Sequence, residues 1–249
     1  SKYLGLVTKK FNDFFLVDLK NQENSGNSQK FLCKVKKSIN FKDQLIYVGD
    51  EVAIEKIDFK SKRAIITSLK KRKNLLVRPS VANISNIYVT FSVEEPELNL
   101  SQVNRFLISA ESMGVEVSLV LTKCDLISEK RRLFLIDKFK KWGYQVITLN
   151  MQKSNNFQNL ITELKHKQCS IFLGPSGVGK TTLLNMIIPN LQKKTAPVSS
   201  KIKRGKNTTR NIELFSTKAS ERSFIADAPP PPTAIPEATS NARLPELIA

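Results

Sequence analysis

Histidine and cysteine are scarce in this 249-residue chain, which has one His and three Cys. Cys33, Cys124 and Cys169 lie far apart in the sequence, and His166 has no cysteine partners at metal-ligand spacing. This distribution excludes a zinc cluster and a disulfide framework. It is typical of a reducing compartment, so we expect a cytoplasmic protein without bound zinc.

Long apolar runs are absent as well. No segment approaches the roughly 20 apolar residues that a membrane helix needs, and residues 1–5 contain no apolar targeting segment. We therefore expect no membrane partner. No feature of the sequence indicates an oligomer, and we expect a monomer.

Acidic residues are few relative to basic ones: 22 Asp+Glu stand against 40 Lys+Arg, a net charge of +18. Residues 1–73 alone contain 17 basic and 8 acidic side chains. Such a surplus favours a polyanionic partner, because Lys and Arg neutralise phosphates and release counterions. A merely lysine-rich soluble protein would have the same composition, so charge alone leaves that alternative open.

Residues 1–73 are predicted to form a small all-β barrel. Short apolar or alternating runs occupy residues 4–7, 14–18, 31–35, 51–57 and 63–69, with polar turns between them. About five short strands in this length fit an OB-fold, which often binds nucleic acid. Basic residues either line one face or are ordinary solvated positions: Lys34, Lys36, Lys37, Lys42, Lys60, Lys62 and Arg63. The basic run at residues 70–73 is either a linker or an RNA contact.

From residue 83 the pattern changes to alternating strands and helices. Strands are predicted at residues 86–93, 115–121, 145–149, 170–173, 211–215 and 223–226, and helices at 100–113, 128–142, 157–167 and 181–188. This rhythm predicts a doubly wound α/β domain over residues 74–228. Residues 229–249 are rich in Pro and Ala and are expected to be a disordered tail.

A complete phosphate-binding loop stands between a predicted strand and helix: Gly174, Pro175, Ser176, Gly177, Val178, Gly179, Lys180 and Thr181. Its backbone N–H groups and the helix N-terminus favour a bound phosphate. We expect Lys180 to reach the β- and γ-phosphates, Thr181 to bind Mg²⁺, and the following Thr182 to belong to the nucleotide site.

A second motif, Thr122-Lys123-Cys124-Asp125, ends a predicted buried strand, where ligands bind in α/β sheets. The Asp125 carboxylate can accept hydrogen bonds from guanine N1–H and the 2-amino group, a donor pair that adenine lacks. Lys123 can lay its aliphatic stem along the base. In the alternative, Asp125 only caps a turn and the protein uses ATP.

The guanine motif precedes the phosphate loop, which reverses the order of ordinary GTPases and indicates circular permutation. A segment with two threonines, residues 205–210, follows the phosphate-loop helix, where a GTPase keeps its first switch. Thr208 or Thr209 is expected to bind Mg²⁺ and to sense the γ-phosphate.

Together these segments resemble the ribosome small-subunit-dependent GTPase A family, which joins an OB-fold to a circularly permuted GTPase domain. The resemblance rests on residues 48–50, 76–83, 121–125, 174–185 and 205–215. It implies GTP/GDP and Mg²⁺ as ligands and the small ribosomal subunit with its rRNA as partner. It further implies a role in late subunit maturation and hydrolysis that the ribosome stimulates. A backbone N–H of Met151 would contact guanine, and Asp227 would organise Mg²⁺.

The sequence departs from the family pattern at three places. Asn207 replaces the usual His, and Asn150-Met151 replaces Ser-Ala. After Asp227 the family's Thr-Pro-Gly-Phe is replaced by Ala-Pro-Pro-Pro, and Pro230 has no N–H to offer a γ-phosphate. The family's C-terminal zinc module has no counterpart in this sequence. Two hypotheses follow: a GTP-binding protein with impaired hydrolysis, or an ending altered by truncation or a frame change after about residue 226.

Overall fold

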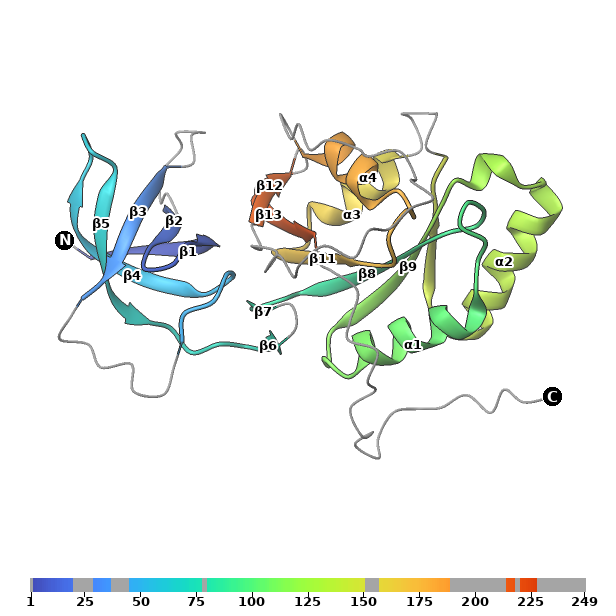
Figure 1. Cartoon of the computed structure of the whole chain (residues 1–249), viewed down its shortest axis with the longest axis horizontal. Helices are drawn as coiled ribbons and strands as arrows, with labels where there is room; N and C mark the ends of the chain where they lie inside the picture. The colour runs from blue at the N-terminus through green and yellow to red at the C-terminus, as the bar shows by residue number, and fades with distance from the viewer. Residues whose placement is uncertain are drawn as a thin grey trace, which may run out of the picture.

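The computed structural model describes residues 2–19, 29–36, 45–77, 80–150, 157–188, 214–217 and 220–227. A small β-barrel and a larger α/β layer lie side by side along the long axis of the molecule (Figure 1). The predicted tail at residues 229–249 lies outside the described residues.

The barrel closes from five strands in the order β1-β2-β3-β5-β4. The β3–β5 pair is parallel and the other pairs are antiparallel, which is the strand pattern of an OB-fold. Alternate residues such as Val17, Phe31 and Ile66 are fully buried inside it. All five predicted strands are confirmed: β1 (Tyr3–Lys10), β2 (Phe15–Leu19), β3 (Lys30–Val35), β4 (Glu51–Asp58) and β5 (Arg63–Leu69).

A short hairpin, β6 (Leu75–Val77) and β7 (Ser80–Ala82), joins the barrel to the sheet. Sequence reasoning missed it because each strand has only three residues. Gly49 packs against this hairpin with φ +90°, and a Cβ at that position would overlap the Ala82 carbonyl oxygen. Glycine is therefore required where the barrel meets the junction.

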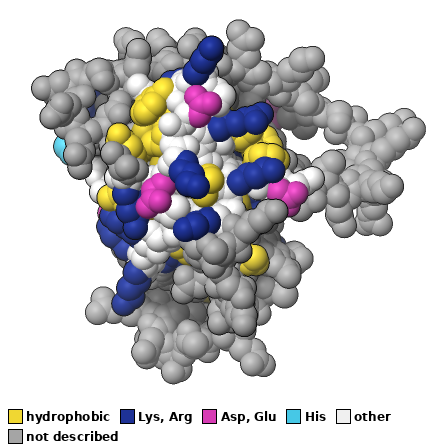
Figure 2. All heavy atoms as spheres, turned by 90° about the vertical axis from the view of Figure 1, so that its left-hand side faces the viewer, with side chains coloured by type: hydrophobic (Ala, Val, Ile, Leu, Met, Phe, Trp, Pro, Cys, Tyr) yellow, Lys and Arg dark blue, Asp and Glu magenta, His cyan; other side chains and the backbone are white. Residues whose placement is uncertain are grey.

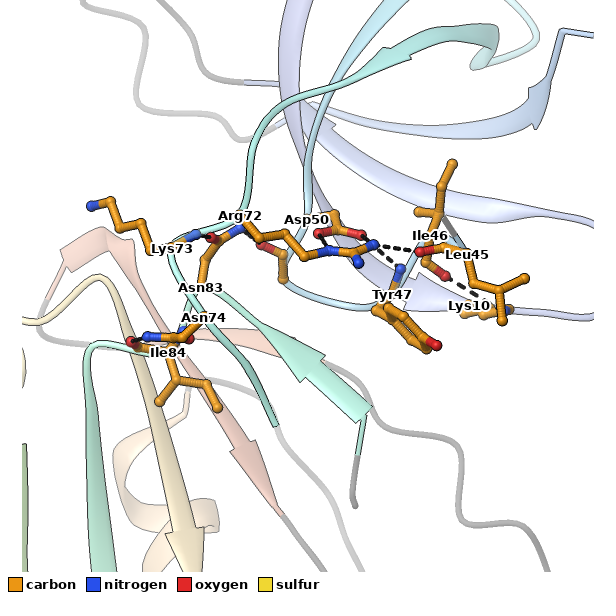
Figure 3. Close-up of polar contacts among 11 residues, drawn as sticks. Lys10, Leu45, Ile46, Tyr47, Asp50, Arg72, Lys73, Asn74, Asn83 and Ile84 are labelled. Carbon is orange, nitrogen blue, oxygen red and sulfur yellow. Dashed lines mark hydrogen bonds and ion pairs between the residues drawn. The ribbon is translucent and has the colours of Figure 1, made fainter. Parts of the chain in front are cut away.

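Side-chain hydrogen bonds fix the junction (Figure 3). The Arg72 guanidinium donates to both carboxylate oxygens of Asp50, at 2.6 and 2.7 Å, and the Asp50 side chain is fully buried. The Asn83 amide donates to the Gly49 carbonyl at 2.9 Å, and its oxygen accepts from the Lys73 N–H at 2.8 Å. These bonds hold the barrel against the segment that leads into the sheet.

The larger α/β part is built on a six-stranded sheet in the order β10-β9-β8-β11-β13-β12. All neighbours are parallel except β12, which pairs antiparallel with β13. Helices α1 and α2 pack on one face, and α3 and α4 on the other. The strands are β8 (Asn86–Ser92), β9 (Glu116–Thr122), β10 (Gln145–Thr148), β11 (Cys169–Leu173), β12 (Leu214–Thr217) and β13 (Ser220–Asp227). The helices are α1 (Leu100–Glu111), α2 (Glu129–Lys141), α3 (Gln158–Leu164) and α4 (Lys180–Ile187).

Strand order explains the reversed motifs. Counted from β11 as the first strand and continued through β8 as the fourth, the sheet runs 2-3-1-4-5-6. Direction of winding changes between β11 and β8, and ligands bind at such a switch point, beyond the carboxyl ends of the strands. The doubly wound fold is therefore intact although the chain enters it at β8.

Local capping signals in the sequence are realised in the helices. Ser128, the first residue of the predicted helix at 128–142, caps α2, because its side chain accepts from the Arg131 N–H. Asn99 caps α1 in the same way, through the Gln102 N–H. Of the predicted strand at residues 211–215, residues 214 and 215 lie in β12, which spans Leu214–Thr217, and residues 211–213 lie outside the described residues. Among the helices that the structure describes, none has the length and apolar character to span a membrane.

Candidate functional site

A buried hydrogen bond joins the two sequence motifs at the carboxyl edge of the sheet. The Thr122 hydroxyl, at the end of β9, lies 2.6 Å from the Val178 carbonyl oxygen in the phosphate loop and 3.3 Å from the Phe91 carbonyl oxygen. Thr122 is fully buried. Thr122, which we predict as part of the nucleotide site, therefore ties one motif to the other through its hydroxyl.

The phosphate loop follows β11, and the backbone sets its shape. Gly174 lies so close to β8 that a Cβ would overlap the Thr90 carbonyl oxygen. Gly177 and Gly179 have φ values of +85° and +89°, a region that side chains disfavour. Ser176 and Gly177 are exposed at the tip of the loop. These glycines therefore shape an open loop directly before the N-terminus of α4.

Lys180, the first residue of α4, folds back over this loop. Its ammonium group donates to the carbonyl oxygens of Gly174 and Pro175, each at 2.7 Å. A positive charge is thereby held beside the loop's N–H groups, where phosphate charge would be offset. Thr181 and Thr182 follow, half-buried in the first turn of α4.

The guanine motif forms a tight turn beyond β9. Lys123 has a left-handed backbone (φ +56°), and η1 (Cys124–Leu126) continues the turn. The Cys124 N–H donates to the Leu149 carbonyl at 3.1 Å, which anchors the turn to the end of β10. Burial raises the pKa of the Cys124 thiol to about 11, so the thiol stays protonated. Asp125, the next residue, is exposed at the site.

The loop after β8 also contributes to the site, and no motif predicted it. The Lys123 ammonium donates to the Glu95 carbonyl oxygen, and Arg131 of α2 forms a 2.6 Å ion pair with Glu94. Gly177 faces the same loop, because a Cβ there would lie 3.6 Å from Pro96 Cδ. This loop therefore contacts both motifs. A sequence pattern could not reveal it, since two of the contacts use backbone or ring atoms.

Several predicted site residues lie outside the described residues, namely Met151, Thr208 and Thr209, together with Asn207. Asp227 is described in its backbone: it ends β13, in parallel register with Phe172 of β11. The strand therefore delivers Asp227 to the same edge as the phosphate loop. In the part of the chain that the structure describes, no group of three or more His, Cys, Asp or Glu forms a metal site.

On the barrel face in Figure 2, Lys and Arg side chains lie among hydrophobic ones, with fewer acidic side chains between them. Lys34 lies 4.6 Å from the Phe14 ring centroid and Lys9 lies 5.4 Å from that of Phe11. Phe11 is 41% exposed. Of the predicted basic residues, Lys37 and Lys42 lie outside the described residues, while Lys34, Lys36, Lys60, Lys62 and Arg63 are all exposed.

Comparison with known proteins decides the family. The model of the RsgA GTPase family matches residues 69–230. The chain belongs to the RsgA GTPase family. A small ribosomal subunit biogenesis GTPase RsgA from Prochlorococcus marinus (strain NATL2A) is 37% identical over 236 residues, covering 92% of this chain and 75% of the relative. One from Synechococcus sp. (strain CC9605) is 39% identical over 204 residues, covering 82% and 66%.

Solved structures agree with an RsgA-type fold. YjeQ from Thermotoga maritima superimposes with a TM-score of 0.74 at 25% identity, covering 92% of this chain and 75% of YjeQ. YloQ, described as a circularly permuted GTPase, gives a TM-score of 0.72 at 24% identity, covering 92% and 72%. The prediction of a permuted GTPase domain after an OB-type barrel is thus confirmed.

Proposed function

We propose that this chain binds and hydrolyses GTP with Mg²⁺ and acts in the late maturation of the small ribosomal subunit, which stimulates hydrolysis. The observation that carries the proposal is the 2.6 Å bond between Thr122 and Val178. It unites a guanine-type motif and a phosphate loop in one site, although 56 residues separate them. Family membership supports the same reading.

The residues present fit a nucleoside triphosphate. The open loop at residues 174–179, the Lys180 ammonium and the N-terminus of α4 would hold the β- and γ-phosphates. We assign Mg²⁺ to the hydroxyl of Thr181, with Asp227 and one of Thr208 and Thr209 completing its surroundings. The ion would offset negative charge on the phosphates.

Asp125 is assigned to guanine selection, with Lys123 along the base and the Met151 N–H toward the guanine oxygen. Exchange of Asp125 for Asn replaces a charged acceptor of two hydrogen bonds by an amide, a loss of about 3 kcal/mol or roughly 100-fold in GTP affinity. Asp137→Asn, an equivalent exchange on α2, is the matched control and should leave GTP binding unchanged. Equal binding of ATP and GTP by the unmodified chain would refute the assignment.

The barrel at residues 1–73 is proposed to contact rRNA, as the separate unit that precedes the GTPase domain at 74–228. Exposed lysines beside aromatic rings support this, because bases stack on rings while ammonium groups meet phosphates.

Phosphate release from GTP, measured with and without purified small subunits, tests whether the subunit stimulates hydrolysis. Subunits that leave the rate unchanged would contradict it.

One observation favours a second candidate, a GTP-binding protein that hydrolyses slowly. In the sequence, Pro230 replaces the glycine of the family pattern whose N–H would meet the γ-phosphate, and proline has no N–H. Under this reading GDP and GTP bind with similar affinity and subunits do not accelerate turnover. Pro230→Gly should then raise the rate of GTP hydrolysis that is measured with small subunits present. Pro232→Gly serves as the control for a nearby loss of proline.

A further inference from the structure

Helix α2 carries an exposed aromatic ring that the GTPase fold does not use. Phe134 is 62% exposed and its neighbour Leu133 is 53% exposed, while Leu135 and Phe139 bury the opposite side of the helix in the core. A lone exposed apolar side chain is ordinary. What surrounds this ring is informative.

Lysines flank Phe134 along the outer face. Lys130 and Lys138 lie four residues before and after it and therefore share its stripe on the helix. The Lys138 ammonium is 6.0 Å from the Phe134 ring centroid. The acidic residues of α2 are used elsewhere: Glu129 pairs with Arg132, and Asp137 with Lys141 at 2.7 Å. Among the described residues no carboxylate pairs with Lys130 or Lys138.

This arrangement suits a nucleic acid better than a protein. A stable protein interface needs about 800 Å² per partner around an apolar centre, and two apolar side chains among lysines do not provide one. A single exposed ring on a stripe that also carries two lysines matches one stacked base with its flanking phosphates. The occupant that the charges favour is therefore single-stranded RNA.

The position of α2 makes this surface distinct from the barrel. The barrel and α2 lie at opposite ends of the molecule (Figure 1), and α2 begins directly after the guanine turn. We propose that Phe134, Lys130 and Lys138 form a second RNA-binding surface that stacks an unpaired nucleotide of the small-subunit rRNA. This rests on the proposed function for the identity of the RNA. Two contacts on one long RNA would reinforce each other.

Binding of the full chain to deproteinised small-subunit rRNA and to intact subunits tests the proposal. Phe134→Ala should weaken rRNA binding about tenfold, the loss of one stacked base. Lys130→Glu/Lys138→Glu should weaken it further and lower the magnitude of the slope of log affinity against log salt by about 1.4, the value for two phosphate contacts on a single strand. Phe134→Ala should leave that slope unchanged. Arg105→Glu/Lys165→Glu, an equal charge change on other exposed positions, is the control, and GDP affinity should stay constant throughout.

The outcomes distinguish failure of the second RNA-binding surface from failure of the proposed function. If both α2 variants bind rRNA like the unmodified chain, the second surface is refuted while the proposed function stands. Loss of binding to intact subunits only would point to a ribosomal protein and overturn the RNA assignment. If the unmodified chain binds neither subunits nor rRNA, the proposed function fails first.

Discussion

The bond between Thr122 and Val178 yields the sharpest prediction, because it connects the guanine turn to the phosphate loop. Thr122→Val removes the hydroxyl and keeps the shape of the side chain. The Val178 carbonyl then loses its 2.6 Å donor in a place that water does not reach, since Thr122 is 0% and Val178 1% exposed. Such an unmade bond costs about 1–3 kcal/mol.

This penalty is divided between the free energy of unfolding and the affinity for GDP. If the phosphate loop of Thr122→Val stays closed without nucleotide, the free energy of unfolding falls. If the loop opens, GDP binding must close it, and the affinity for GDP falls. Because the loop tip is exposed whereas β9 is buried, we expect the larger part in affinity, about tenfold for GDP. Fluorescent GDP titration and urea unfolding measure the two parts.

Thr8→Val is the matched control. Thr8 is also buried, at 1% exposed, but its hydroxyl lies 3.3 Å from the Leu16 carbonyl oxygen within the barrel, so the exchange leaves the phosphate loop untouched. GDP affinity should be unchanged in this variant. If Thr122→Val shows neither weaker GDP binding nor lower stability, the bond does not hold the site together and the reasoning is wrong.

Further predictions concern the junction, the loop and the pH dependence of stability. Arg72→Met leaves Asp50 buried without its cation and should lower the free energy of unfolding by about 3 kcal/mol in urea, with Arg72→Met/Asp50→Ala losing less than the two single changes together. Gly174→Ala should abolish GDP binding in the same titration, because its Cβ would overlap the Thr90 carbonyl oxygen. The raised pKa of Cys124, about 11 against 9.0, means that the folded chain retains a proton that the unfolded chain releases, so the contribution of this thiol to stability falls by about 1.4 kcal/mol per pH unit between pH 9 and 11. Urea midpoints at pH 8 and 10 should differ less in Cys124→Ala.

Much of the fold follows from local sequence patterns. Alternating residues in the barrel and continuous apolar runs such as β8 and β11 identify strands whichever neighbour they later find. Caps such as Ser128 mark where helices begin. The reversed motif order also predicts a permuted sheet, because it depends on sequence position alone.

Contacts between distant segments were beyond such patterns. The residues around Asp50 and Arg72 show no pattern that predicts their ion pair, which joins positions 22 residues apart. The bond of Thr122 is a similar case: a hydroxyl at a strand end can meet a ligand or a neighbouring carbonyl, and only the fold shows that it donates to Val178. The loop at residues 93–99 reaches Lys123 through the Glu95 carbonyl oxygen, a backbone atom that any residue possesses.

Permutation also fixes how force would pass between the two ends of the molecule. The barrel is attached at the start of β8, and Gly174 packs against Thr90 of the same strand, about 13 Å away at the usual rise per residue. Ladders on both sides of β8 run parallel to that direction. A tug on the barrel would therefore load many hydrogen bonds at once, in shear, instead of unzipping them singly. Strand β8 therefore connects the phosphate loop to the barrel rigidly, because its hydrogen bonds on both sides resist stretching.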